Sequence, residues 1–130
     1  MKKVLLFDCL GEISKRITCT FKGTADCEAL VVSDIQELRS RFYRLRKEGD
    51  GCGKTFPSLI ILHCSEDGKR ILSFVRWLRT VECWYHPVLC MVPREVWDTS
   101  VAQELRERFD CECVEPWQWI YPTYRLLKLV

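Results

Sequence analysis

An apolar run in the middle of the chain constrains the fold more than any other feature. Residues 57–63 read PSLIILH, with four consecutive apolar side chains at Leu59–Leu62. A strand with one solvated face alternates apolar and polar residues, so a continuous apolar run predicts a strand that is buried on both faces. Such strands lie inside parallel sheets covered by helices. The run ends in His63 and Cys64, and functional groups of open α/β sheets gather at the carboxyl ends of strands.

Apolar runs of this kind recur along the chain and alternate with segments of helical spacing. The runs that predict strands are Val4–Phe7, Ala29–Val32, Leu59–Leu62, Val88–Val92 and Cys111–Val114. Apolar residues spaced by three and four follow in Ile13–Phe21, Ile35–Leu45, Ile71–Leu78, Val101–Phe109 and Ile120–Leu127. The order βαβαβαβαβα predicts a doubly wound α/β fold with a five-stranded parallel sheet.

The size and charge of the chain favour one domain over residues 1–130. A chain of 130 residues that is 48% hydrophobic is long enough to bury about two-thirds of its unfolded surface. The 20 basic and 18 acidic residues give a net charge of +2, so the totals predict neither a nucleic-acid nor a membrane partner. Only Val4–Phe7 is strongly apolar near the start, far short of the roughly 20 residues of a membrane span. We therefore expect a cytoplasmic protein.

Nine cysteines is an odd and high number for a cytoplasmic chain. Without an export signal we expect reduced thiols, and those inside apolar runs, such as Cys90 and Cys113, are expected to behave as small core hydrophobes. Zinc sites require two ligand pairs at short spacing, and the chain has no C-x-x-C pair. The sequence therefore predicts no metal and no cofactor.

Two further features predict local structure. Asp34 precedes a helical segment and is a good N-cap, because its carboxylate accepts free amide protons of a first helical turn. Gly49–Thr55 contains three glycines and predicts an exposed connection from the second helix to the third strand. Its ending resembles a phosphate-binding P-loop, but Glu48 stands where the first glycine of that motif is required.

Four segments resemble the motifs of one family. Val4–Asp8 is similar to a first strand that ends in an acidic pair, and Pro57–Leu62 to a third strand that carries a phospho-acceptor. Pro87–Val92 is similar to the fourth strand, and Glu115-Pro116 stands where the family has Lys-Pro. In length, element order and these motifs, nearly the whole chain resembles the response-regulator receiver domain of two-component signalling. The resemblance implies a flavodoxin-like topology with strand order 2-1-3-4-5.

The same resemblance implies a degenerate phospho-acceptor pocket. The family uses an acidic pair for magnesium, an aspartate nucleophile, a hydroxyl residue and a lysine. The residues at these positions here are Asp8, Cys9, His63, Val92 and Glu115. Magnesium prefers several oxygen ligands, and only Asp8 remains of the acidic pair. We therefore expect a pseudo-receiver that acts by protein–protein interaction without aspartyl phosphorylation.

In the receiver family, the fourth helix, fifth strand and fifth helix form the surface that contacts partners or a second subunit. In this chain the corresponding stretch is rich in aromatic residues, namely Trp97, Trp117, Trp119, Tyr121 and Tyr124. Tryptophan and tyrosine are frequent interface anchors. The prediction is a protein partner or self-association through this face, and the alternative is that most of these rings pack in the core or at the sheet edge.

An enzymatic alternative comes from the end of the third predicted strand. His63-Cys64-x5-Arg70 is similar to the His-Cys-x5-Arg pattern of cysteine phosphatases and lies between a strand and a helix. Cys64 would attack phosphorus while Arg70 and the loop amides hold the phosphate oxygens. Glu66 and Asp67, however, place two carboxylates in that loop, where they would repel the phosphate. We therefore predict that the chain is not an enzyme and retain the cysteine phosphatase as the alternative.

Overall fold

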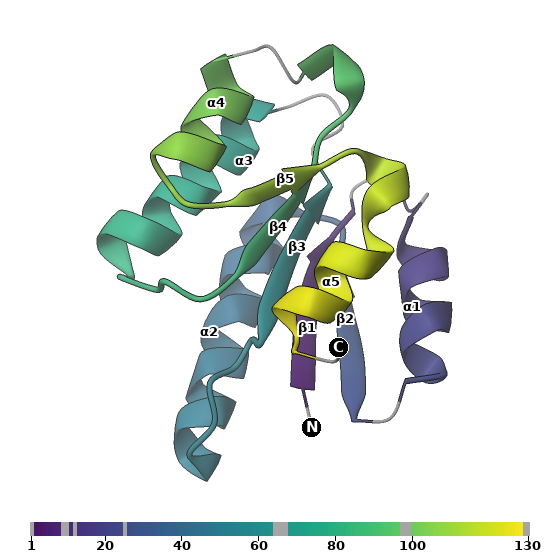
Figure 1. The fold of residues 1–130 in the computed structure, drawn as a ribbon. Helices are drawn as coiled ribbons and strands as arrows, with labels where there is room; N and C mark the ends of the chain where they lie inside the picture. Colours follow the sequence, from purple (N-terminus) through teal and green to yellow (C-terminus); the bar gives the residue numbers. More distant parts are fainter. Residues whose placement is uncertain are drawn as a thin grey trace. The chain divides into compact units, whose positions relative to one another are not determined.

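The computed structural model has an α/β fold with a parallel five-stranded sheet in the order β2-β1-β3-β4-β5 (Figure 1). This is the flavodoxin-like topology, so the predicted fold class and strand order are confirmed. The structure describes residues 2–8, 11, 13–24, 26–63, 68–96 and 100–128. None of the helices in these ranges has the length and apolar character that a membrane crossing requires.

The chain divides into two compact units, Met1–Ile61 and Leu62–Val130. The first contains β1 (Lys2–Phe7), α1 (Ser14–Lys22), β2 (Cys27–Val32) and α2 (Ile35–Cys52). Strands β1 and β2 pair in parallel, from Lys2 opposite Cys27 to Phe7 opposite Val32. Within this unit, α1 and α2 lie on opposite sides of the strand pair (Figure 1). That a single domain covers residues 1–130 stays a prediction.

The start and end of α2 show how its sequence defines it. Asp34 accepts a hydrogen bond from the Gln36 backbone amide at 3.0 Å, which confirms the predicted N-cap. The predicted exposed connection over Gly49–Thr55 is wrong at its start, because the helix continues to Cys52. Gly53 then ends it in the left-handed conformation with φ of 72°, which glycine adopts without the steric cost of a Cβ.

The packing around Gly49 explains why a glycine is needed near the end of α2. The residue is buried, and a Cβ at this position would lie 2.6 Å from the Lys54 carbonyl oxygen and 2.9 Å from the Phe56 amide nitrogen. The chain that leaves α2 therefore passes directly against the helix backbone. The glycine makes room for this close passage, so the segment is packed at Gly49 and only its end is an exposed connection.

Strand β3 (Leu59–His63) is buried at all five positions. The three apolar residues that belong to the first unit, Leu59–Ile61, have no exposed surface at all. This confirms the prediction, made from the lack of alternation, that both faces of the strand are covered.

The second unit begins with Leu62 and His63, the last residues of β3, and continues through a series of short elements. They are α3 (Gly68–Arg76), the π-helical turn η1 (Trp77–Val81), β4 (Val88–Met91), the 3₁₀ turn η2 (Arg94–Val96), α4 (Ser100–Glu107), β5 (Glu112–Val114), the 3₁₀ turn η3 (Pro116–Gln118) and α5 (Ile120–Leu126). Strands β4 and β5 pair in parallel, with Cys90 opposite Cys113. Helix α5 lies across these strands from α3 and α4 (Figure 1).

Helices α3 and α4 pack against one another, and Gly68 is at their contact. A Cβ at Gly68 would lie 3.1 Å from the Val101 Cγ1 atom, so the first residue of α3 has little room for a side chain. Asp98 and Thr99, which precede α4 in the sequence, lie outside the described residues. The π-helical turn that extends α3 was not predicted from the sequence.

Candidate functional site

Asp8, the first residue of the predicted pocket, follows β1 in the first unit. Its carboxylate is buried, and Oδ2 accepts hydrogen bonds from the backbone amides of Ile13 at 2.9 Å and Ser14 at 2.8 Å. These two donors belong to the start of α1, where the positive end of the helix dipole also favours a negative charge. Asp8 therefore holds the first turn of α1. The neighbouring Cys9 lies outside the described residues.

The other residues of the predicted pocket lie at strand ends in the second unit. His63 ends β3 and is 6% exposed, and Val92 follows β4 and is buried. The Val92 amide donates to the Val114 carbonyl at 2.8 Å, so the ladder with β5 continues past the end of β4. The two positions that the receiver resemblance predicts for an aspartate and a hydroxyl residue thus carry an imidazole and an isopropyl group. Among the described residues, no three His, Cys, Asp or Glu side chains are grouped to hold a metal ion.

Glu115, the last residue of the predicted pocket, is the N-cap of η3 and forms a capping box with Gln118. Its Oε1 accepts a hydrogen bond from Arg94 Nε at 3.0 Å, and its Oε2 accepts one from Trp117 Nε1 at 2.7 Å. The carboxylate therefore orients the Trp117 indole. In this structure Glu115 supports the aromatic surface that follows it in the chain.

Three large apolar side chains form an exposed surface on η3 and α5. Trp117 is 70% exposed, Tyr121 is 66% exposed and Ile120 is 49% exposed. Residues three and four apart lie on one side of a helical segment, so Ile120 and Tyr121 extend the surface that starts at Trp117. We call these three residues the η3–α5 face. Tyr124, one turn further along α5, is half-buried beside it.

The structure separates the five aromatic residues that were predicted as interface anchors. Trp119 is only 5% exposed and belongs to the core, so its ring has almost no surface to offer a partner. Two positions along a helix correspond to a rotation of about 200°, which turns Trp119 away from Trp117 and Tyr121. Trp97 lies outside the described residues. The alternative of a core position therefore holds for Trp119, while Trp117 and Tyr121 are exposed.

Charged pairs border the η3–α5 face. Arg94 pairs with Glu115, and Arg125 on α5 pairs with Glu112 on β5. The arginine of the first pair is highly exposed and its glutamate is mostly covered. The border thus presents both signs of charge.

The phosphatase alternative concerns the segment between β3 and α3. Cys64, Glu66 and Asp67 lie outside the described residues, while Arg70 is exposed on the first turn of α3. The only glycine of the motif, Gly68, packs closely on Val101 of α4. Gly68 therefore has a role in helix packing that is independent of any anion.

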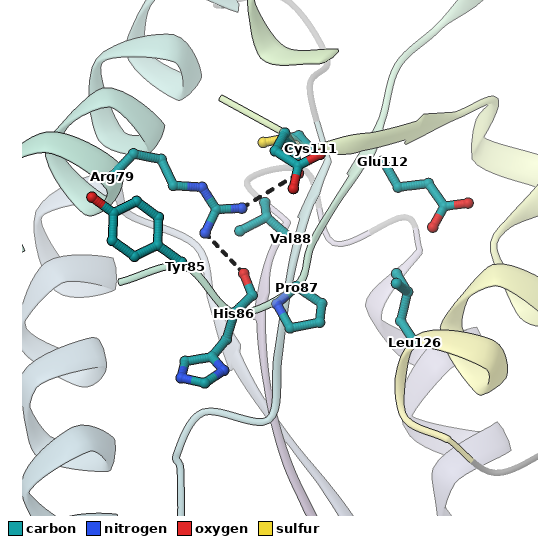
Figure 2. Close-up of a pocket in the computed structure, with 9 residues that line it drawn as sticks. Arg79, Tyr85, His86, Pro87, Val88, Cys111, Glu112 and Leu126 are labelled. Atoms are coloured by element: carbon teal, nitrogen blue, oxygen red, sulfur yellow. Dashed lines mark hydrogen bonds between the residues drawn. The ribbon is translucent and has the colours of Figure 1, made fainter. Parts of the chain in front are cut away.

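The largest polar feature that the sequence reasoning missed is the buried Arg79 of η1. It is 6% exposed and lies in the wall of a cavity of about 260 Å³ that also includes Tyr85, His86 and Glu112. Its Nε donates to the Phe109 carbonyl at 2.9 Å. One terminal nitrogen donates to the carbonyl of Trp84 at 2.7 Å. The same nitrogen donates to the carbonyl of His86 at 2.9 Å (Figure 2).

The bonds of Arg79 join two connections of the second unit, one before β4 and one before β5. The other terminal nitrogen makes a longer contact of 3.5 Å with the Asp110 carbonyl (Figure 2). A guanidinium group presents five donors in a fixed plane, which suits several carbonyl oxygens at once. The spacing of residues in the sequence could have predicted that Arg79 is buried. It follows the buried Val75 by four residues and so shares its side of the helix.

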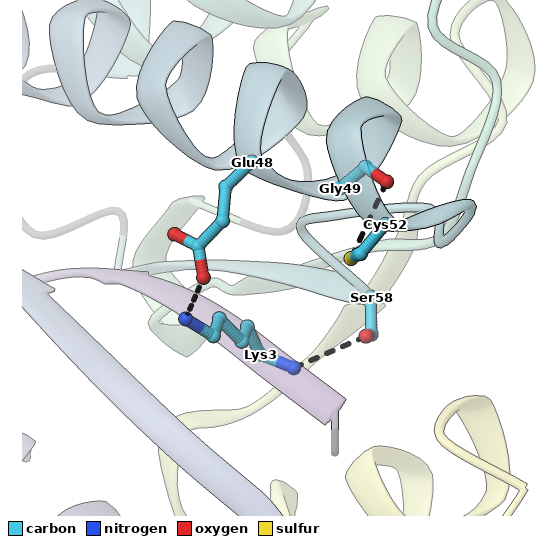
Figure 3. Close-up of polar contacts among 5 residues, drawn as sticks. All are labelled: Lys3, Glu48, Gly49, Cys52 and Ser58. Carbon is cyan, nitrogen blue, oxygen red and sulfur yellow. Dashed lines mark hydrogen bonds and ion pairs between the residues drawn. The ribbon is translucent and has the colours of Figure 1, made fainter.

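A smaller polar cluster ties β1 to the end of α2 in the first unit (Figure 3). The Lys3 ammonium group pairs with Glu48, and the Lys3 backbone amide donates to Ser58 Oγ at 3.1 Å. The hydrogen bond to Glu48 raises the pKa of Lys3, and burial opposes this rise. These contacts join β1 to residues that lie far from it in the sequence, and they stabilise the unit.

Comparison with known proteins adds no assignment. No family model matches the chain, and no curated protein matches its sequence. The flavodoxin-like topology and the η3–α5 face are therefore the observations on which a functional proposal rests.

Proposed function

We propose that the chain is a cytoplasmic, receiver-like signalling domain that acts by protein contact and without aspartyl phosphorylation. The exposed η3–α5 face is the single observation that carries this proposal. The flavodoxin-like topology agrees with it but is shared by proteins with many functions, so it adds little by itself.

The chemistry at the strand ends supports the part of the proposal that excludes phosphorylation. A receiver transfers a phosphoryl group to an aspartate at the end of the third strand, where this chain has the buried His63. The lysine that would pair with the phosphoryl group is replaced by Glu115, whose negative charge would repel it. Glu115 is already bonded to Arg94 and Trp117.

The size of the η3–α5 face indicates a weak interaction. With side-chain areas of 150–250 Å², the exposed fractions of Trp117, Ile120 and Tyr121 amount to roughly 300–400 Å² per chain. Stable complexes bury about 800 Å² on each partner. The three side chains therefore suffice for the centre of an interface, where most binding energy is concentrated. We expect a Kd on the order of 100 μM.

The charges around the face favour a second copy of this chain as the partner. In a two-fold dimer the same patch meets itself, so the patch must be complementary to its own charges. The exposed Arg94 on one side, and Arg125 with Glu112 on the other, provide both signs beside the apolar centre. In such a dimer, an arginine of one chain can approach Glu112 of the other, whereas Glu115 is mostly covered.

Sedimentation velocity of the full chain tests this proposal over concentrations from about 10 μM to about 1 mM, which bracket the expected Kd. The wild type should shift from monomer to dimer, and a chain with both Trp117→Ala and Tyr121→Ala should remain monomeric. Tyr43→Ala is the matched control, because Tyr43 is 50% exposed on α2 in the other unit. It should dimerise as the wild type does.

Two results would overturn the proposal of self-association. One is a wild type that stays monomeric at the highest concentration. The other is a Trp117→Ala, Tyr121→Ala chain that dimerises as strongly as the wild type. Circular dichroism of each variant checks that the fold is retained.

A further inference from the structure

Two cysteines lie side by side on neighbouring strands of the second unit. Cys90 of β4 is the direct register partner of Cys113 of β5. Neighbouring strands are about 4.8 Å apart, and register partners direct their side chains to the same face of the sheet. Disulfides join residues whose Cα atoms are about 4.4–6.8 Å apart. The strand pairing therefore brings the two thiols within reach of one another without a change of backbone.

The two thiols differ in their access to solvent. Cys90 is fully buried, whereas Cys113 is half-buried on the three-residue edge strand β5. A small oxidant can thus reach Cys113 directly, while Cys90 has no exposed surface. This is the arrangement of a thiol that is oxidised first and a second thiol that resolves it.

The surroundings of Cys113 also favour its reactive form. A hydrogen bond with the Cys90 thiol lowers the pKa of Cys113, and the nearby Arg106 lowers it further, against the opposing effects of burial and of the Glu112 carboxylate. The thiolate is the species that attacks an oxidant, so a larger thiolate fraction near neutral pH increases the rate of oxidation.

We propose that Cys113 is a site of reversible oxidation by peroxides and that Cys90 is its resolving thiol. The Cys113 thiolate attacks one oxygen of hydrogen peroxide, the O–O bond breaks, and hydroxide leaves, so that Cys113 becomes a sulfenic acid. Cys90 sulfur then attacks the Cys113 sulfur. The S–S bond forms, the S–O bond breaks, and the sulfenic oxygen leaves as water with the proton of the Cys90 thiol. A dithiol reductant reverses the reaction by thiol–disulfide exchange.

Cys27 provides a matched control within the same chain. It is also half-buried on an edge strand, but its register partner in β1 is Lys2, and burial raises the pKa of its thiol. A reaction governed by accessibility alone would modify Cys27 and Cys113 alike. The proposal requires Cys113 to react first.

The first experiment exposes the reduced full chain to increasing hydrogen peroxide at neutral pH, then alkylates the remaining thiols and maps the peptides without reduction by mass spectrometry. The expected product is an intramolecular Cys90–Cys113 disulfide that a dithiol reductant removes, formed before any modification of Cys27. A disulfide between other cysteines, or oxidation of Cys27 at the same peroxide concentration as Cys113, would overturn the proposal.

Two variants separate the roles of the thiols. With Cys90→Ser, a sulfenic-acid trap such as dimedone should label Cys113, because no neighbouring thiol resolves the intermediate. With Cys113→Ser, neither the disulfide nor the trapped adduct should form on β4 or β5. A Cys90→Ser chain in which dimedone does not label Cys113, or a Cys113→Ser chain in which it labels Cys90, contradicts the assignment.

A measurement on the wild type keeps the test independent of how the variants fold. Alkylation by iodoacetamide should reach half of its maximal rate at a lower pH for Cys113 than for Cys27, because the pKa of Cys113 is lowered and that of Cys27 is raised. The opposite order of the two pH profiles would refute the proposed thiolate character.

Discussion

The two compact units make the return from helix to strand in opposite ways. In the first, the chain passes closely over Gly49 and turns at Gly53, so the connection depends on the absence of side chains. In the second, the connection before β4 is held by the long, charged side chain of Arg79. Both connections are specific, one through backbone contact and the other through hydrogen bonds to carbonyl groups. A glycine-rich segment and a buried arginine can therefore serve the same structural purpose.

The units also differ in the apolar surface that they expose. On α2 of the first unit the apolar stripe of Leu38, Phe42 and Leu45 is buried, and only Tyr43 is a large exposed hydrophobic residue of that helix. On η3 and α5 of the second unit, Trp117 and Tyr121 are exposed. A helix that serves only the core directs its apolar residues inward. The second unit departs from this rule, which is why the proposed function is placed there.

Replacing Arg79 should have the largest effect on stability. Arg79→Met replaces the aliphatic part of the arginine with an unbranched apolar chain but removes the guanidinium that donates to the carbonyls of Phe109, Trp84 and His86. Buried groups without partners cost about 1–3 kcal/mol each, so we expect a loss of about 3–5 kcal/mol in the free energy of unfolding.

The measurement for Arg79→Met is chemical denaturation followed by circular dichroism. Arg76→Met is its control, because Arg76 is half-exposed and its pairing with Glu104, at 3.7 Å, lies at the surface. Surface pairs contribute about 0–1 kcal/mol. Equal losses in the two variants would show that the bonds to the carbonyls contribute little.

Gly49 and Gly51 should respond to alanine with opposite signs. Gly49→Ala places a Cβ 2.6 Å from the Lys54 carbonyl oxygen, and we expect a loss of about 1–3 kcal/mol from the forced displacement. Gly51 is exposed in the same helix with no atom within 4 Å of its Cβ position, so Gly51→Ala should stabilise the chain by about 0.5–1 kcal/mol. Thermal unfolding of both variants measures the difference. A Gly49→Ala variant as stable as the wild type would show that the chain does not pass this close to α2.

The smallest expected effect concerns phosphatase activity, because we predict that the wild type has none. The wild type should release no phosphate from an aryl phosphate above the rate of the Cys64→Ser variant. The assay measures the aryl alcohol by absorbance. A steady rate that Cys64→Ser abolishes would support the cysteine phosphatase and contradict a pure binding domain.

Much of the fold could be predicted because its signals are local. The lack of alternation in Leu59–Leu62 predicted a buried strand, and β3 is buried throughout. Asp34 was identified as a cap from its place before an apolar stripe, and its hydrogen bond is made within two residues. Gly49 was misassigned because its surroundings include the chain returning from Gly53 to Phe56, which residue type alone does not reveal.

The candidate surfaces were predicted less completely. The aromatic composition of residues 97–124 predicted an interface region, but it did not distinguish Trp117 from Trp119, whose exposed fractions are 70% and 5%. The distinction depends on the rotation of η3 against the rest of its unit. Glu115 was predicted as a pocket residue from its place after β5, whereas its bonds to Arg94 and Trp117 depend on where those side chains lie.

The sequence by itself determined the order of strands and helices, because periodicity and caps act over a few residues. The tertiary structure alone decided which distant residues become neighbours. Arg79 reaches carbonyls as far as Phe109, and the pairing of β4 with β5 sets Cys90 opposite Cys113. Such neighbours follow from strand register and helix packing, which involve many weak contacts at once and are not encoded in any single segment.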